Sequence, residues 1–413
     1  MNIKKKIIKY HSNFIWFFFI AIVLINYVAL FQYSLNFWGV WKIGEWLINY
    51  EHGLVRRGAI GNLFILPGRF FDLSSLTISY LVFIFVNVVT FFIFFITQKI
   101  YLLNAKNIGS FILLLSPAYI LFPFYCFQVA DRKEILIFLS FSILALAYVL
   151  RGERDATKFK THVLIFLSYF IFLISLFSHE TTMFTLPFFL FLIFKMQKKL
   201  IINLFYLKIY YLLFIISTIF CLCFTIYLSS DQNYNTLISE KICTGLLQMG
   251  FNNQMCLPIS SGIALNSSMY IDITKNFYSM LLKNYIVLII MSLIPIFISD
   301  WFKKIENKLL IIFGLLPLLP LFVLATDLGR WINIYIFLIF TIVLSDGTSV
   351  NFKIKKIPIV FVFIYLSTWS MSNSFGHPNH SFRDMLIYNI KNSLLFQPIT
   401  LLNDFHKYKK IER

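Results

Sequence analysis

Four short segments of the chain carry charged side chains that could bind an anion and move a proton. They span residues 49–58, 130–134, 178–182 and 327–331, and each interrupts a strongly apolar stretch. Charges at such places are costly unless they are paired or functional. Guanidinium groups can fork onto two oxygens of one phosphate, so arginines in this setting favour phosphate recognition. The candidate phosphate-binding cations are Arg56, Arg57, Arg132, Lys133 and Arg330.

The same four segments supply groups that could accept a proton or orient the cations. These carboxylates and imidazoles are Glu51, His52, Asp131, Glu134, His179, Glu180 and Asp327. A substrate with an anionic leaving group and a nucleophile that must lose a proton needs both kinds of group. A phosphate-linked sugar attacked by a hydroxyl is such a substrate. Structural roles stay open beside the functional ones, because Asp131 could cap a helix and Asp327 could brace a loop through Arg330.

The composition requires a membrane around these segments. Hydrophobic residues make up 59% of the 413 positions and charged residues only 13%. A soluble domain is about half apolar and about a quarter charged, so this chain could not cover a water-facing surface. The net charge of +18 is better explained by basic cytoplasmic loops than by nucleic acid, and we expect no nucleic-acid partner.

Apolar runs of about 20 residues predict membrane spans, with shorter runs possible where neighbouring helices shelter them. The first run follows a lysine cluster but is too long for a signal peptide and lacks a cleavage site. We predict an all-α polytopic integral membrane protein, one transmembrane domain over residues 1–413 with about 11 helices. The predicted spans are 14–34, 76–97, 108–125, 135–150, 162–178, 182–195, 207–228, 284–300, 309–325, 331–346 and 357–372.

Charge counts orient the predicted spans. With the N-terminus inside, the inner loops hold 20 of the 36 basic residues and 5 of the 18 acidic ones, as the positive-inside rule requires. The outer segments are then residues 35–75, with an interfacial stretch, a large loop at 229–283 and a tail at 373–413. The tail is basic, and a further segment near 385–402 would return it to the inside. All four charged segments fall on the outer face.

Two cysteines share the large outer loop. Cys243 and Cys256 could form a disulfide in an oxidising compartment, and the sequence leaves open whether they do. No ligand spacing demands a metal, although a divalent ion could bridge some carboxylates. We expect no cofactor.

The arrangement of these motifs resembles the GT-C superfamily of membrane glycosyltransferases. The resemblance covers most of the chain and rests on about eleven spans with one acid in the first outer loop, Glu51, and another in the second, Asp131 or Glu134. It implies a polyprenyl-phosphate or polyprenyl-diphosphate glycosyl donor on the non-cytoplasmic face. It also implies that the first-loop carboxylate is the general base. The first loop lacks a second adjacent acid, so His52 is the substitute candidate.

The resemblance further implies that arginines near the membrane surface hold the phosphate, a role that Arg56, Arg57, Arg132 and Arg330 match by placement. Asp131, His179, Glu180 and Asp327 would position sugars or orient those arginines. A chain rich in Phe and Ile with a large outer loop is also similar to bacterial O-antigen and capsule repeat-unit polymerases of the Wzy type. Membership implies an undecaprenyl-diphosphate-linked donor and acceptor in the bacterial inner membrane, with a polysaccharide chain-length regulator as a further partner.

Other classes remain open. A single-sugar polyprenyl-phosphate-dependent transferase differs only in its acceptor, and an acyltransferase is less favoured. A flippase or transporter for lipid-linked oligosaccharides usually places ionisable residues near the bilayer midplane and has repeated halves. The predicted spans carry almost no charge and show no repeat. A scaffold without enzymatic activity would not need acids and arginines from four separate loops, although structural ion pairs can imitate a site.

Overall fold

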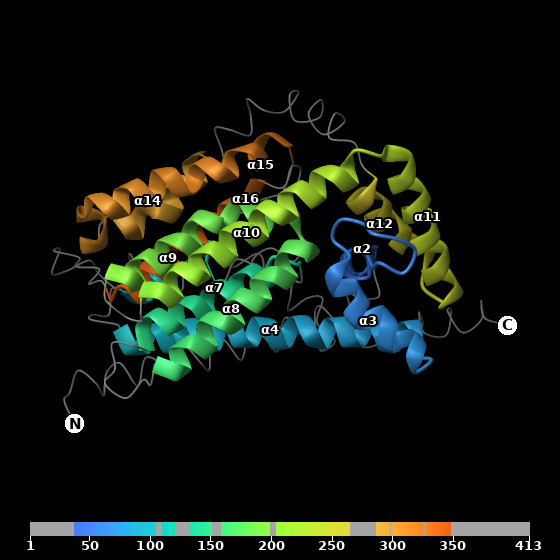
Figure 1. Cartoon of the computed structure of the whole chain (residues 1–413), viewed down its shortest axis with the longest axis horizontal. Coiled ribbons are helices and arrows are strands. Elements are labelled where there is room, and N and C mark those ends of the chain that lie inside the picture. Colours follow the sequence, from blue (N-terminus) through green and yellow to red (C-terminus); the bar gives the residue numbers. More distant parts are fainter. Residues whose placement is uncertain are drawn as a thin grey trace, which may run out of the picture.

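The structure is a computed structural model, and it describes residues 37–104, 110–114, 116, 118–119, 132–150, 158–198, 204–264, 286–297, 299–324 and 328–347. This part of the chain is 86% helical and contains no strand. The helices run mostly along the long axis of the molecule (Figure 1). The expectation of an all-helical fold is therefore confirmed for the described residues.

Among the described residues, five helices are long and apolar enough to cross a membrane. Three of them are α4 (Ser75–Asn104), α8 (Lys158–Ser178) and α10 (Leu204–Ser229). The fourth runs through α14 (Ile305–Leu315), η4 (Leu316–Leu318) and α15 (Leu319–Leu324), and the fifth is α16 (Leu328–Ser345). Shorter apolar helices are α7 (Ile135–Leu150) and residues Ile286–Phe297. These helices make the chain a membrane-embedded protein.

Eight predicted spans coincide with helices of the structure, from α4 through α16. The predicted span at 182–195 starts later than expected: a 3-10 turn, η1 (Glu180–Thr185), precedes α9 (Leu186–Lys198). Of the predicted span at 108–125, the structure describes only α5 (Ser110–Leu114) and three further residues. The predicted spans at 14–34 and 357–372 lie outside the described residues.

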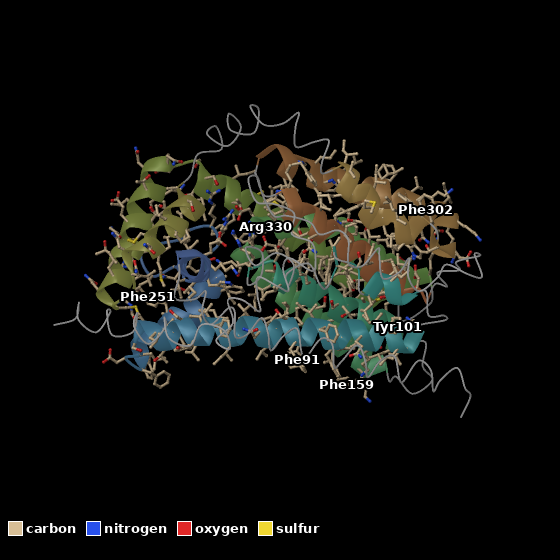
Figure 2. The ribbon with its side chains drawn as sticks, turned by 180° about the vertical axis from the view of Figure 1, so that it is seen from behind. Phe91, Tyr101, Phe159, Phe251, Phe302 and Arg330 are labelled. Carbon is tan, nitrogen blue, oxygen red and sulfur yellow. A yellow bond between two sulfur atoms is a disulfide. The ribbon has the colours of Figure 1, made fainter. Side chains whose placement is uncertain are left out.

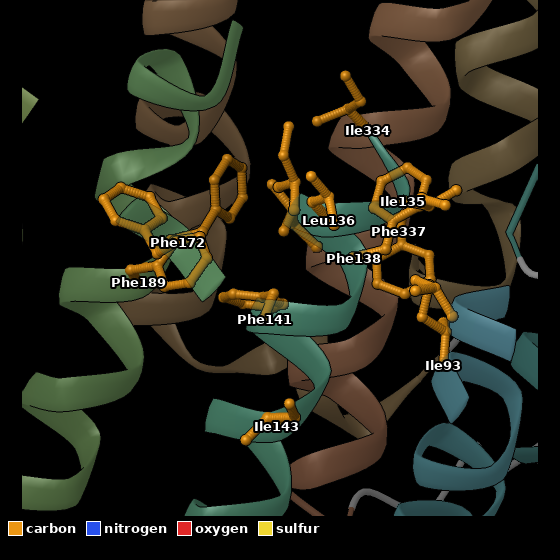
Figure 3. Close-up of a cluster of buried hydrophobic side chains, with 14 of the residues drawn as sticks. Ile93, Ile135, Leu136, Phe138, Phe141, Ile143, Phe172, Phe189, Ile334 and Phe337 are labelled. Carbon is orange, nitrogen blue, oxygen red and sulfur yellow. The ribbon is translucent and has the colours of Figure 1, made fainter. Parts of the chain in front are cut away.

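Helix α7 forms the centre of the bundle because it is apolar on every side, and such a helix has no face to offer to water. Phe138 of α7 stacks on Phe337 of α16 with ring centroids 4.2 Å apart (Figure 3). Small residues allow α7 to approach α8 closely: Ser140 and Ser168 each donate a hydrogen bond to the other's carbonyl oxygen, at 2.7 and 2.8 Å. Helix α16 is buried along its whole length.

Helix α10 shows the opposite pattern, with large apolar side chains exposed along its length. Phe205, Ile216, Phe220 and Tyr227 are each more than half exposed. An apolar face of this extent on a single chain is what lipid tails would cover.

One end of the bundle, here called the capped end, is formed by α2 (Phe37–Trp46), α3 (Ala59–Phe70), α11 (Gln232–Gln248) and α12 (Cys256–Ile263) (Figure 1). Helices α11 and α12 come from the predicted large outer loop, with the short turn η2 (Asn253–Met255) between them. A disulfide between Cys243 and Cys256 joins the two helices, which answers the question that the sequence left open. Arg330 lies between Phe251 at the capped end and Phe302 at the other (Figure 2).

The opposite end of the bundle is held together by Asp346. Its carboxylate accepts hydrogen bonds from Tyr148 Oη at 2.8 Å and from Trp301 Nε1 at 2.7 Å, and it pairs with Lys195. Trp301 belongs to the turn η3 (Asp300–Lys303). The carboxyl ends of α7, α9 and α16 therefore meet here. It follows that residues 132–134, 179–180 and 328–330 lie together at the capped end.

Candidate functional site

Two hydrogen bonds at the capped end join Arg57 to Glu180. Arg57 follows the first-loop turn, and Glu180 opens η1 after α8. Nε of Arg57 donates to Oε2 of Glu180 at 2.7 Å, and Nη2 donates to Oε1. Arg56 Nη1 lies 3.9 Å from the same Oε1. Burial alone would raise the pKa of Glu180, but the charge of Arg57 outweighs it and holds that pKa well below its usual range.

The backbone of Arg57 is in the left-handed region, with φ of 69°. This conformation is uncommon for a residue with a side chain and is often found at functional sites. Lys133 Nζ donates to the carbonyl oxygen of Arg57 at 2.8 Å, which fixes that backbone. Only 2% of Lys133 is exposed, and this burial lowers its pKa to about 7. Lys133 is therefore placed to hold Arg57 in position.

A second buried group, next to the Arg57–Glu180 ion pair, consists of Glu134, His179 and Arg330. Arg330 Nη2 donates to Glu134 Oε1, and His179 Nε2 lies 3.2 Å from the same oxygen. All three side chains are about 5% exposed. Burial alone would raise the pKa of Glu134, but Arg330 and His179 keep it well below its usual range. Three segments far apart in the sequence thus meet at one carboxylate.

Glu45 is a member of this group that the sequence reasoning missed. It lies on α2, and its Oε1 accepts a hydrogen bond from Arg132 Nη1 at 2.6 Å. Burial alone would raise the pKa of Glu45, but Arg132, Arg330 and Arg57 together lower it. Glu45 stands between apolar residues, which is the same signal that marked the other charges, but it lies in the outer segment 35–75, where we expected an interfacial stretch.

These side chains are called the charge cluster below. Its members are Glu45, Arg56, Arg57, Arg132, Lys133, Glu134, His179, Glu180 and Arg330. The described residues of the cluster comprise five basic and three acidic side chains, with His179 beside them. Asp131 and Asp327, two of the predicted site residues, lie outside the described residues.

Glu51 and His52 form a separate group, called the rim pair below. Glu51 forms an ion pair with Arg69, with Glu51 Oε1 2.6 Å from Arg69 Nε, and Glu51 Oε2 lies 3.9 Å from His52 Nε2. The Glu51 and His52 side chains are 22% and 31% exposed, so they are more open than Glu134 or Arg330. Asn49 holds this turn, because its Oδ1 accepts a hydrogen bond from the Glu51 N–H at 3.0 Å. The sequence suggested no pairing for Arg69.

The hairpin of α11 and α12 covers both the rim pair and the charge cluster. A methyl group placed on Gly245 of α11 would lie 3.0 Å from His52 Nε2 and 3.9 Å from Glu51 Oε2. One placed on Gly262 of α12 would lie 3.8 Å from Arg57 Nη1. Because these two glycines allow close contact, one disulfide-linked hairpin packs against both the rim pair and the charge cluster. A ligand bound between the rim pair and the charge cluster would be covered by this hairpin.

The glycines of the first loop have a structural role, because each allows close packing within the chain. A methyl group on Gly58 would collide with the Tyr50 ring. One on Gly61 would collide with the Ile48 carbonyl oxygen. Gly53 has φ of 144° and contacts the Tyr234 hydroxyl. These positions pack the loop that carries Arg57 onto α3 and α11.

No family model, curated protein or solved structure matches this chain. The chemistry must therefore be argued from the geometry alone. Within the described ranges, no group of three or more His, Cys, Asp or Glu side chains is arranged to hold a metal ion. The cluster can bind an anion through its arginines, and the rim pair can accept a proton from a group bound beside it.

Proposed function

We propose that this protein is a membrane glycosyltransferase that acts on polyprenyl-(di)phosphate-linked glycans at the periplasmic face of a bacterial inner membrane. Its product would be a polymer of O-antigen or capsular repeat units. The observation that carries the proposal is the charge cluster itself. Five basic side chains and three acidic ones gather at one end of a bundle of lipid-facing helices.

Position favours a phosphate attached to a lipid. The polar head of such a lipid lies at the end of the hydrocarbon layer, and the cluster lies at the ends of α7, α8 and α16. A phosphate oxygen is a strong acceptor for guanidinium groups. Because much of the cluster is shielded from water, each such contact is stronger than it would be on an open surface.

The charge cluster and the rim pair would carry out different parts of the reaction. The hydroxyl oxygen of the acceptor attacks the anomeric carbon of the donor sugar, and the bond from that carbon to the phosphate oxygen breaks. Arg57, Arg132 and Arg330 stabilise the departing polyprenyl diphosphate, an electrostatic role that can lower a barrier by several kcal/mol. Glu51 of the rim pair takes the hydroxyl proton, with His52 as its neighbour. Glu134 of the cluster is more buried than Glu51 and is paired with Arg330, so an acceptor hydroxyl reaches Glu51 more easily.

A transporter for lipid-linked sugars is the second candidate in a different class. Ionisable residues of transporters usually lie near the middle of the membrane, on broken helices. Here the described ionisable residues of the site lie at helix ends: in the last turn of α2, before α3 and α7, after α8 and in the first turn of α16. This placement favours an enzyme.

Product analysis tests the proposal. Purified protein in nanodiscs would receive the lipid-linked glycan fraction of the cells that make it, and products would be separated on a gel. We expect a ladder of lengthening glycans that Glu51→Gln and Arg57→Ala both abolish. Lys198→Ala, which removes an exposed ion pair with Glu306 at the opposite end, is the matched control and should keep the ladder.

A single added sugar would replace the polymerase with a one-step transferase. Movement of labelled lipid across the bilayer without any product would overturn the enzyme and favour the transporter.

A further inference from the structure

The two oxygens of the Glu134 carboxylate are used unequally. Arg330 Nη2 and His179 Nε2 both converge on Oε1. Oε2 is buried and has no hydrogen-bond partner among the residues that the structure describes. A buried carboxylate oxygen without a donor is energetically unfavourable, because it has lost its hydrogen bonds to water and no protein hydrogen bond replaces them. The position is therefore suited to accept a hydrogen bond from a donor that a ligand brings.

His179 lies on the same side of Glu134 as Arg330. The Thr181 backbone N–H donates to Nδ1 of His179 at 3.3 Å, which fixes the ring. Nε2 of His179 then lies 3.2 Å from Glu134 Oε1 and 3.2 Å from Arg330 Nη2. His179 is a positioning residue: with Arg330 it packs against Oε1 and leaves Oε2 without a partner among the described residues.

The chemistry of Oε2 selects the kind of ligand group. A phosphate oxygen would be repelled by the carboxylate, whereas a hydroxyl group donates a hydrogen bond and carries no charge. A phosphate-linked glycan offers both kinds of group, with the phosphate suited to Arg57 and the hydroxyls suited to Glu134. We propose that Glu134 Oε2 is a sugar subsite, accepting a hydrogen bond from a hydroxyl of the lipid-linked glycan. This inference rests on the proposed function and adds a second point of recognition to it.

Two ligands separate the sugar contact from the phosphate contact. Nanodisc protein would be titrated with undecaprenyl diphosphate alone and with the lipid-linked glycan fraction of the cells that make the protein. We expect the wild type to prefer the glycan-bearing lipid. Glu134→Gln should reduce that preference by on the order of tenfold, because an amide N–H at Oε2 donates where an acceptor is needed. Affinity for undecaprenyl diphosphate alone should not fall, because the substitution removes a negative charge beside Arg330 and keeps the arginine.

Three controls make the result decisive. Retained binding of undecaprenyl diphosphate by Glu134→Gln shows that the variant is folded. Glu134→Asp is the second variant should Glu134→Gln fail to fold; it keeps the charge, draws the carboxylate back by one methylene, and should also lose the preference for the glycan. Glu306→Gln, at the opposite end, should match the wild type with both ligands.

The possible failures are distinguishable. If the wild type binds neither ligand, the proposed function fails. If the wild type binds both equally, or Glu134→Gln and Glu134→Asp keep the full preference for the glycan, the sugar subsite is overturned while the phosphate site stands.

Discussion

Arg57 donates two hydrogen bonds to the carboxylate of Glu180, although 123 positions of the sequence separate them. The contact joins the first polar loop to the turn after α8, and Lys133 fixes the backbone of Arg57 from a third segment. The anion recognition that we propose for this end of the bundle would depend on these three residues keeping their geometry.

Glu180→Gln should destabilise the protein at neutral pH. Removing one partner of a buried ion pair costs about 3–5 kcal/mol, and the cost here should be nearer 2–3 kcal/mol because about a fifth of each side chain is exposed. The folded-state pKa of Glu180 lies below the unfolded value of 4.5, so the stabilisation is present above that pH and is lost as pH falls below it. Thermal unfolding in detergent should show this decline in the wild type and a smaller one in the variant. Equal declines would contradict the assignment.

Lys133→Met should remove a different pH dependence. Folded Lys133 releases its proton near pH 7, whereas the unfolded side chain keeps it to about 10.5. Between these values the unfolded chain binds more protons, so the contribution of Lys133 makes the folded state more stable as pH rises. Thermal midpoints across this window should rise less in Lys133→Met than in the wild type. Lys198→Met, which changes an exposed lysine, is the control, and a rise identical in all three proteins would rule out the effect.

Reduction of the Cys243–Cys256 bond should loosen the α11–α12 hairpin. A disulfide that closes a loop of this size stabilises by roughly 3 kcal/mol through the unfolded state. Hydrogen exchange should therefore accelerate in α11 and α12 after reduction, and in the double variant Cys243→Ser with Cys256→Ser. Exchange in α7 should not change, because the bond does not contact the bundle core. Unchanged exchange in α11 would mean that the packing on α2 alone holds the hairpin.

Asp346→Asn should affect stability without affecting the site. Asp346 gathers Tyr148, Lys195 and Trp301 at the opposite end, and the loss of its charge leaves Lys195 without its ion-pair partner. We expect a loss of about 3 kcal/mol, as for other buried pairs with one partner removed. Affinity for undecaprenyl diphosphate should stay within twofold of the wild type in the folded fraction. A large loss of affinity with unchanged stability would show that the two ends are coupled.

Much of the helical architecture could be predicted from the sequence because apolar runs specify it directly. The predicted span at 135–150 has the same bounds as α7, Ile135–Leu150. The error at 182–195 has a local cause: His179 caps the turn, and residues 180–185 form a 3-10 helix before α9 begins. The sequence pattern does not reveal that cap, because it depends on how the histidine ring is placed.

The candidate site could be predicted only as a set of segments. Charges that interrupt apolar runs marked Arg57, Glu134, Glu180 and Arg330, and the structure brings all of them together. Which acid meets which arginine depends on how helices pack, and no local pattern encodes it. For that reason the sequence analysis missed Glu45 and did not predict the ion pair of Glu51 with Arg69. The functional roles of these residues stay predictions.

The central claim is that the charge cluster binds the phosphate of a membrane lipid, and a binding titration tests it most directly. Wild-type protein in nanodiscs would be titrated with undecaprenyl diphosphate and with undecaprenol, which has the same chain and no phosphate. We predict that the diphosphate binds at least about tenfold more tightly, since each charge-assisted hydrogen bond contributes about 1.5–3 kcal/mol. Arg57→Ala should lose most of that difference, while Lys198→Ala keeps it. Equal affinity for the two lipids in the wild type would contradict the account.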